Sequence, residues 1–204
     1  MFGFFKFSAA GTVCSFGGTV SARSGFQLRC VSSTTVDLNI AGLGSVPYTL
    51  ASGSFFDGWH SIAVTKSAGS SAFFLYVDGA VRNGGGSGVS SFTDSPFYVG
   101  TTQAGASPAN GNLSTSGIWN ASLSSADILA LHNSLIVPST APRAFSFLSE
   151  GAGTVGTDIS GNGNNIVMSG ISWSSAEVPY GARELAGARE LAGARELAGA
   201  RELA

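Results

Sequence analysis

The stretch DGWHSIAVTKSAGSSAFFLYVDGAVR, residues 57–82, has the clearest strand pattern in this chain. In its first half, His60, Ile62 and Val64 alternate with serine, alanine and threonine. Alternation with a period of two is typical of a β-strand with one buried face. In its second half, an Asp-Gly pair at 78–79 separates AFFLYV from AVR, and glycine supplies the positive φ of a tight hairpin turn. The stretch therefore predicts antiparallel strands joined by short turns.

Similar short runs recur along the chain with turn residues between them. Charged residues are only 11% of the chain and 29 of its 204 residues are glycine, which suits short strands and tight turns better than helices. Since 44% of the residues are hydrophobic, the chain can bury a core. The further runs are FGFFKF (2–7), TVCSF (12–16), GFQLRCV (25–31), TTVDLNI (34–40), PFYVG (96–100), SGIWN (116–120), AFSFL (144–148) and NNIVMSG (164–170).

One segment, LSSADILALHNSL at 123–135, has a helical pattern instead. Ser124 is placed to be its N-cap, and Asp127 stands three residues later, as in a capping box. Ile128 and Leu131 then fall on one face, which should lie against a sheet. Many short strands with one short helix are typical of a β-sandwich.

Composition argues against several function classes. The formal net charge is −2, so the sequence offers no basic footprint for nucleic acid. No stretch approaches 18 uninterrupted apolar residues, so no membrane span is expected. Lys6 follows and interrupts the apolar start of the chain, which favours an N-terminal strand over a secretion signal.

Taken together, three of these stretches resemble a known family. DGWHSIAVTKSAGSSAFFLYVDGAVR, then PFYVG, then GIWNASLSSADILALHN resemble the laminin G-like branch of the concanavalin A-like lectin and glucanase superfamily. In that family a Trp-His strand is followed by a strand ending in Tyr-Val-Asp-Gly, a strand closing on glycine, and a short capped helix. The resemblance covers residues 2–135 and implies an all-β, antiparallel jelly-roll sandwich with one short helix.

The segment 143–180 stands in an unusual place for this family. Its stretch FSFLSEGAGTVGTDISGNGNN (145–165) is similar to the family's first strand and following loop, yet here it comes after the helix. The resemblance therefore implies a circularly permuted domain over 1–180, in which 143–180 supplies the missing first strand. Permutation is tolerated where the termini of a domain lie close together at its surface. Two alternatives remain open: the segment donates a strand to a neighbouring subunit, or it begins a second repeat.

Four copies of GARELA form a repetitive C-terminal tail, residues 181–204. Glycine returns every six residues, at a cost of about 1 kcal/mol each relative to alanine in a helix. The six-residue period also gives no leucine stripe and no Arg–Glu pair at helical spacing. The tail is therefore expected to be flexible or partly helical, with an oligomerisation or attachment stalk as the alternative.

Asp158, Ser160, Asn162 and Asn164 present oxygen atoms at alternate positions, as in the first half of a calcium loop. The bidentate glutamate that would close an EF-hand is missing, because position 169 is serine. One interpretation is a calcium site that Glu150 or backbone carbonyls complete. The other is an Asx-turn, in which the side chains satisfy their own backbone.

Aromatic residues are candidates for a sugar-stacking platform, although an aromatic residue in a strand more often belongs to the core. The binding candidates that we single out are Trp59, Tyr98 and Trp119, with Trp173, Tyr48 and Tyr76 beside them.

The two histidines and two cysteines have structural interpretations. His60 lies in a strand and is expected to be a structural residue, and His132 is expected to cap the last helical turn. Cys14 and Cys30 are placed to face each other across a hairpin, either as a disulfide or as two buried thiols. Buried free cysteine is common and the spacing fits no zinc motif, so thiols are favoured.

Catalysis has little support in the sequence. The glucanases of the superfamily carry the pattern Glu-x-Asp-x-Glu on one strand, since retaining hydrolysis needs two carboxyls about 5 Å apart. Outside the tail this chain has only two glutamates, Glu150 and Glu177, and no two acidic residues at alternate positions.

The sequence thus predicts a non-catalytic recognition or adhesion module that binds a glycan or a protein partner. Its expected place is outside the cell or on the surface of an assembly such as a virus or phage particle. A structural decoration or fibre protein without sugar specificity is the first alternative, and a polysaccharide hydrolase is the second. A homo-oligomer is compatible with the module and with the fibre protein.

Overall fold

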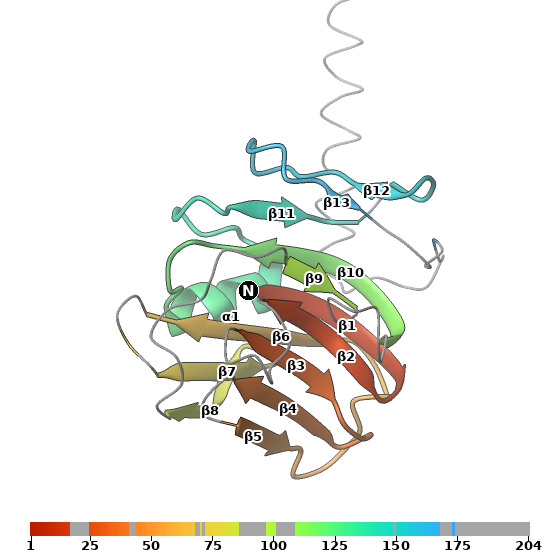
Figure 1. Ribbon diagram of the computed structural model, residues 1–204, viewed down its shortest axis with the longest axis vertical. Helices are drawn as coiled ribbons and strands as arrows, with labels where there is room; N and C mark the ends of the chain where they lie inside the picture. The colour runs from red at the N-terminus through yellow and green to blue at the C-terminus, as the bar shows by residue number, and fades with distance from the viewer. Residues whose placement is uncertain are drawn as a thin grey trace, which may run out of the picture.

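Two antiparallel sheets stack face to face, as Figure 1 shows. The computed structural model describes residues 1–16, 25–40, 44–67, 70, 72–85, 97–100, 109–148, 150–167 and 173. Every strand pair within these residues is antiparallel. The predicted all-β antiparallel sandwich with one short helix is therefore confirmed.

The strands fall into three sheets. The six-stranded sheet contains, in spatial order, β11 (Ala144–Ser146), β10 (Asn110–Ile118), β1 (Phe2–Ala9), β6 (His60–Lys66), β7 (Phe73–Val77) and β8 (Ala80–Gly85). The five-stranded sheet contains β5 (Gly44–Thr49), β4 (Thr35–Ile40), β3 (Phe26–Cys30), β2 (Gly11–Phe16) and β9 (Phe97–Val99). A small third sheet pairs β12 (Val155–Gly156) with β13 (Ile166–Val167).

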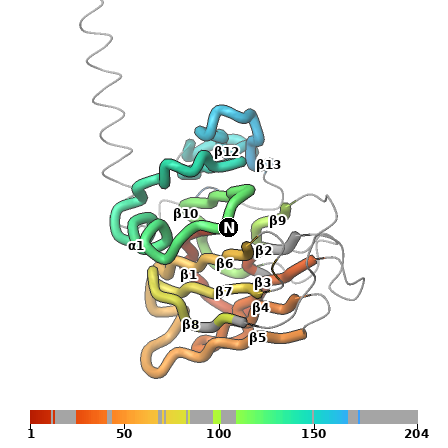
Figure 2. Tube along the Cα trace, turned by 90° about the vertical axis from the view of Figure 1, so that its left-hand side faces the viewer, coloured from red at the N-terminus to blue at the C-terminus, as the bar shows by residue number. Residues whose placement is uncertain are grey.

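The molecule has three layers in the view of Figure 2. The helix α1 (Ser125–Ser134), the six-stranded sheet and the five-stranded sheet follow one another from left to right. The six-stranded sheet therefore lies in the middle and is covered on both faces. The five-stranded sheet has its inner face on the core, and no helix that the structure describes covers its outer face.

Strand β1 shows what this middle position demands of the sequence. Phe5 and Phe7 point into the core between the two sheets, and Phe2 and Phe4 point to the opposite side, toward α1. All four side chains are at most 4% exposed. A strand buried on both faces needs a nearly continuous apolar run, which FGFFKF provides.

Helix α1 begins and ends as its sequence predicts. Ser124 is the N-cap, and its side chain and that of Asp127 form a reciprocal capping box. Ile128, Leu131 and Leu135 are buried on the face toward the six-stranded sheet. Within the described part of the chain, no helix is long and apolar enough to cross a bilayer.

The predicted hairpin turn joins β7 to β8. Asp78 and Gly79 have φ values of 53° and 74°, so both residues are left-handed, as a tight primed turn requires. A Cβ at position 79 would also meet Leu129 and His132 of α1 at about 3 Å. Glycine is thus needed for the turn and for the close approach of the helix.

The late segment attaches to the body of the same chain. Strand β11 pairs with β10 at the edge of the six-stranded sheet, with Phe145 opposite Gly117. Phe145 is 1% exposed, and its ring lies 5.9 Å from that of Trp119. The backbone N–H of Ile159 donates to Phe145 O at 2.8 Å, so the loop returns onto β11. This arrangement matches what a permuted domain over 1–180 needs, and the permutation itself stays a prediction.

Cys30 is a buried free thiol, and burial raises its pKa to about 11. The backbone register places Cys30 opposite Gly11, and Cys14 opposite Leu28. The expectation that the two cysteines face each other is therefore wrong, because the residue opposite Cys14 lies two positions before Cys30.

The GARELA tail, residues 181–204, and most of 168–180 lie outside the described residues.

Candidate binding surface

The outer face of the five-stranded sheet is polar because its strands alternate. In β3, Phe26, Leu28 and Cys30 are buried in the core, whereas Gln27 and Arg29 are partly exposed on the other side. Strand β4 alternates in step with β3, so that their outward residues lie opposite one another. The result is a surface of polar side chains on paired strands.

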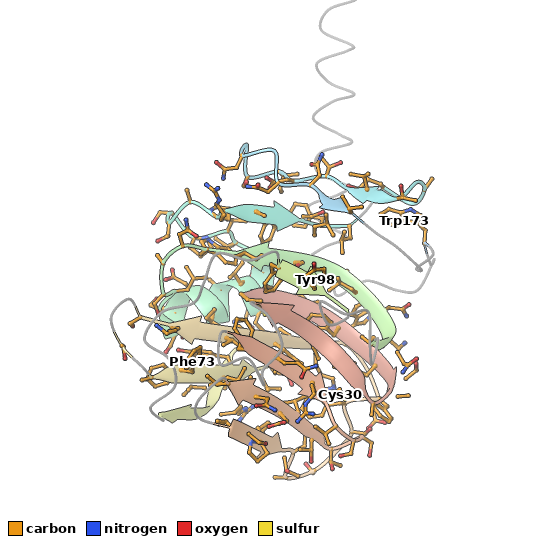
Figure 3. The ribbon with its side chains drawn as sticks, viewed as in Figure 1. Cys30, Phe73, Tyr98 and Trp173 are labelled. Carbon is orange, nitrogen blue, oxygen red and sulfur yellow. The ribbon has the colours of Figure 1, made fainter. Side chains whose placement is uncertain are left out.

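One row of residues crosses all five strands of this face, and we call it the polar row. Four strand spacings of about 4.8 Å give it a length of about 19 Å. Tyr98 stands at its end on β9 (Figure 3), between Phe97 and Val99, whose side chains pack on the core. Along one line the row offers amide, hydroxyl and aromatic groups. By backbone pairing, its members from β5 to β9 are Ser45, Asn39, Gln27, Ser15 and Tyr98.

Beside the polar row lies one ion pair. Arg29 on β3 donates from Nη2 to Asp37 Oδ2, directly opposite on β4. Ser45 Oγ donates to the other oxygen of the same carboxylate. Asp37 is 2% exposed, while the Arg29 side chain is 38% exposed. A ligand on this face would therefore meet the guanidinium and not the carboxylate.

The three aromatic residues predicted to bind do not come together. Trp119 is 7% exposed, and its Nε1 donates to Thr140 O at 3.0 Å. Trp59 packs against the same apolar cluster beneath α1, on the far side of the six-stranded sheet. Tyr98 lies on the five-stranded sheet. A shared stacking platform is therefore not formed, because two of the three rings pack in or against a core.

The other aromatic candidates also have structural roles. Tyr76 is 5% exposed in the cluster beneath α1. Tyr48 packs against the core between the sheets, with the Arg82 guanidinium 5.6 Å from the centre of its ring. Trp173 lies away from the polar row, near the small sheet (Figure 3), and its Nε1 donates to Gly153 O at 2.8 Å.

Asp158 anchors the late segment with both oxygens. Oδ1 accepts hydrogen bonds from Phe145 N at 3.0 Å and Ser160 N at 2.9 Å. Oδ2 accepts from Ser160 Oγ at 2.9 Å and Asn164 N at 2.8 Å. Burial by itself raises the pKa of Asp158, but the hydrogen bonds from Phe145, Ser160 and Asn164 outweigh it and lower the pKa overall. The carboxylate is thus held ionised by protein donors.

The other predicted calcium ligands have protein partners as well. The amides of Asn162 and Asn164 both donate to Arg143 O, and Glu150 Oε1 accepts from Thr157 N. No group of three His, Cys, Asp or Glu side chains in the described residues is arranged to hold a metal ion. These contacts fit the Asx-turn interpretation, because a calcium ion would have to displace donors from the carboxylate. Calcium binding stays the untested alternative.

The two histidines join neighbouring elements. His60 Nδ1 lies 3.0 Å from Asp78 Oδ2, and its Nε2 lies 3.3 Å from Ser54 O. The hydrogen bond with Asp78 raises the pKa of His60, although burial opposes the shift. His132 Nδ1 lies 2.9 Å from Ser61 Oγ on β6. His60 is structural, as expected, whereas His132 bonds a side chain of the sheet instead of the carbonyls of its own helix.

The antiparallel two-sheet sandwich and its capped helix place the chain in the class of jelly-roll β-sandwiches. The model of the concanavalin A-like lectin/glucanases superfamily matches residues 5–129, which is more than half of the 204 residues. The chain therefore belongs to this superfamily, in agreement with the laminin G-like resemblance of its sequence. No curated protein matches the chain.

Solved structures with the same fold have very different sequences. A Bacteroides ovatus protein, provisionally described as carbohydrate binding, has a TM-score of 0.63 at 18% identity over 87% of this chain. The match covers 53% of that protein, so the chain spans about half its length. A heptameric SAP-like pentraxin from Limulus polyphemus has a TM-score of 0.55 at 12% identity, over 84% of this chain and 81% of its own. At these identities the likeness shows the fold alone.

Most of this surface has no recognisable motif in the sequence. Its polar positions on two predicted strands are Gln27, Arg29, Asp37 and Asn39. The signal that could have found them is the pairing of GFQLRCV with TTVDLNI, whose polar positions share one face. Alternation alone does not say which polar face a second layer covers. This face becomes a candidate site because no helix among the described residues covers it.

Proposed function

We propose that this chain is a non-catalytic module that binds carbohydrate across the polar row of the five-stranded sheet. The observation that carries the proposal is the row itself. A sugar presents hydroxyl groups that both donate and accept hydrogen bonds, and it also has an apolar ring face. Asn39 can serve the hydroxyl groups, and Tyr98 offers a ring for stacking. Because both side chains stand on paired strands, they need little ordering on binding.

The superfamily and one structural relative support the same class of ligand. The superfamily includes lectins as well as glucanases, and the Bacteroides protein is itself provisionally described as carbohydrate binding. A shared fold does not fix a function. The proposal therefore rests on the outer face of the five-stranded sheet, which no described helix covers and which we call the open face.

The described carboxylates support binding over hydrolysis. A retaining hydrolase needs two carboxyls about 5 Å apart, free to act as nucleophile and acid. The sequence has no Glu-x-Asp-x-Glu strand, and four of the described aspartates serve the structure. Those contacts are Asp37 with Arg29, Asp78 with His60, Asp127 with Ser124, and Asp158 with Phe145.

Location and partner belong to the same proposal. Glycans that such a module would recognise lie outside cells and on surfaces, so we place the protein in an extracellular or surface-associated setting. Recognition of a protein partner, and display on a virion as a decoration or fibre component, are the alternatives. Neither alternative requires sugar selectivity, so a binding measurement separates them from the proposal.

Affinity electrophoresis through gels that contain soluble polysaccharides tests the proposal. The intact chain should be retarded by at least one polysaccharide. Asn39→Ala and Tyr98→Ala should each weaken that retardation by about fivefold, as expected for the loss of one hydrogen bond or one ring contact. Both changes are at a surface and should leave the fold intact.

Phe74→Ala is the matched control for the aromatic change. Phe74 is 39% exposed on β7, on the outer side of the other sheet, so its removal should leave retardation unchanged. A folded chain that no polysaccharide retards would contradict the proposal. Equal losses of retardation in Phe74→Ala and Tyr98→Ala would show that the binding site lies outside the polar row.

A further inference from the structure

The five strands that form the open face carry little charge. Their sequences GTVCSF, FQLRC, TVDLNI, GSVPYT and FYV contain one arginine and one aspartate, and no other Asp, Glu, Lys or Arg residue. These two residues are Arg29 and Asp37, which pair with each other. The formal charge of the strands is therefore zero, and the two charged residues lie opposite each other on adjacent strands.

Asp37 controls how Arg29 meets a ligand. Asp37 is the partner that the structure gives for Arg29 in the described residues, and Arg29 Nε is buried there without a hydrogen-bond partner. The guanidinium is thus held in place by the carboxylate. Because Ser45 holds the second carboxylate oxygen, Asp37 is itself fixed from the neighbouring strand. Arg29 from β3 and Ser45 from β5 thus hold Asp37 from both neighbouring strands.

The pair discriminates between neutral and acidic ligands. A ligand carboxylate or sulfate that approached Arg29 would also approach the charge of Asp37, and the two interactions would largely cancel. A neutral hydroxyl group meets no such repulsion, and it can accept from a guanidinium N–H. Repulsion of the wrong ligand by a fixed charge is a common source of specificity.

We propose that Asp37 is a specificity-determining residue that makes the open face select neutral glycans over acidic ones. This inference rests on the proposed function, because it concerns the ligand of the same face. It implies that removal of the negative charge of Asp37, without any new contact, shifts the preference of the face from neutral to acidic polysaccharides.

Paired polysaccharides that share a backbone test this inference. Suitable pairs are hydroxyethylcellulose with carboxymethylcellulose, methyl-esterified pectin with polygalacturonate, and dextran with dextran sulfate. The intact chain should be retarded more by the neutral member of its preferred pair. Asp37→Asn should strengthen retardation by the acidic member by about tenfold or more at low ionic strength. The gain should disappear in about 1 M salt, where charges are screened within a few ångströms.

Two variants serve as controls. Thr35→Ala changes an uncharged side chain on the same strand as Asp37, outside the polar row. It leaves the charge of the face unchanged, so the preference should stay neutral. Arg29→Gln combined with Asp37→Asn restores zero charge, so the gain on acidic polysaccharides should be lost. If Asp37→Asn does not fold, Thr35→Lys, outside the polar row, provides the second route. It adds a positive charge next to the pair without touching it, and it should produce a similar gain.

The outcomes separate the two proposals. Equal or stronger retardation of the intact chain by the acidic member would overturn the inference and leave carbohydrate binding standing. A folded Asp37→Asn chain without a gain on the acidic member would do the same. No retardation of the intact chain by any polysaccharide would overturn carbohydrate binding, and the inference with it.

Discussion

The outer faces of the two sheets differ in what covers them. On the six-stranded sheet, Phe2, Phe4 and Tyr76 lie beneath α1, and none is more than 5% exposed. On the five-stranded sheet, the corresponding face carries Gln27 and Asn39, which are partly exposed. Both faces are built from strands with a period of two, so the period does not decide their chemistry. What decides it, within the described residues, is whether another layer covers the face.

The largest effect that tests this comparison is a truncation on the covered face. Phe2→Ala removes a fully buried ring from the cluster beneath α1 and leaves a cavity. The free energy of unfolding should fall by about 3–5 kcal/mol, as for other large-to-small core changes. Urea unfolding followed by circular dichroism measures it.

Asn39→Ala on the open face is the matched control. Its side chain lies among polar neighbours and is partly exposed, so the free energy of unfolding should change by about 0.5 kcal/mol or less. Similar losses in the two variants would mean that the outer face of the five-stranded sheet is also packed, and it would then not be open to a ligand.

Much of the covered face could be predicted from the sequence. The helix, its capping box and its buried side all follow from LSSADILALHNSL, because capping and a one-sided apolar pattern act within a few residues. The turn at Asp78-Gly79 is equally local. The role of Trp119 was harder to see, since its burial depends on Phe145 and on the path of the chain near Thr140.

The open face could not be predicted in the same way. Its polar row exists only because five strands align in one register, and the row joins residues as far apart as Ser15 and Tyr98. The pairing register also determines where the cysteines lie: Cys14 is opposite Leu28, two residues from Cys30. Pairings between distant segments are set by the whole sheet, and no short stretch of sequence contains them.

A smaller effect sharpens the comparison at the edge of the covered face, where Asp158 holds β11. Asp158→Asn keeps the shape of the side chain but replaces one acceptor with an amide donor that faces existing N–H and O–H donors. The free energy of unfolding at pH 7 should fall by about 2–3 kcal/mol, because buried donors lose their partner. Asp127→Asn, at the exposed helix cap, should cost about 1 kcal/mol or less.

The Asp158 contribution should also depend on pH. Its pKa is lowered in the folded state, so the stabilisation is present above the unfolded pKa of about 4. It is lost as the pH falls through the lower folded pKa. The difference in unfolding free energy between the parent and Asp158→Asn should be constant from pH 8 to 5 and should shrink below about pH 4. A difference that grows on acidification would contradict the hydrogen-bonding scheme.

The smallest expected effect is that of calcium. It tests whether a binding site lies in the late segment or on the five-stranded sheet. Both Asp158 oxygens accept from protein donors, and the Asn162 and Asn164 amides donate to a backbone carbonyl. An ion at this loop would have to replace those bonds, so millimolar calcium or a chelator should leave the melting temperature unchanged. A rise in melting temperature with calcium that is absent in Asp158→Asn would establish an ion site in the late segment. If polysaccharide retardation also required calcium, recognition would belong to that loop, and the open face of the five-stranded sheet would no longer be needed to explain binding.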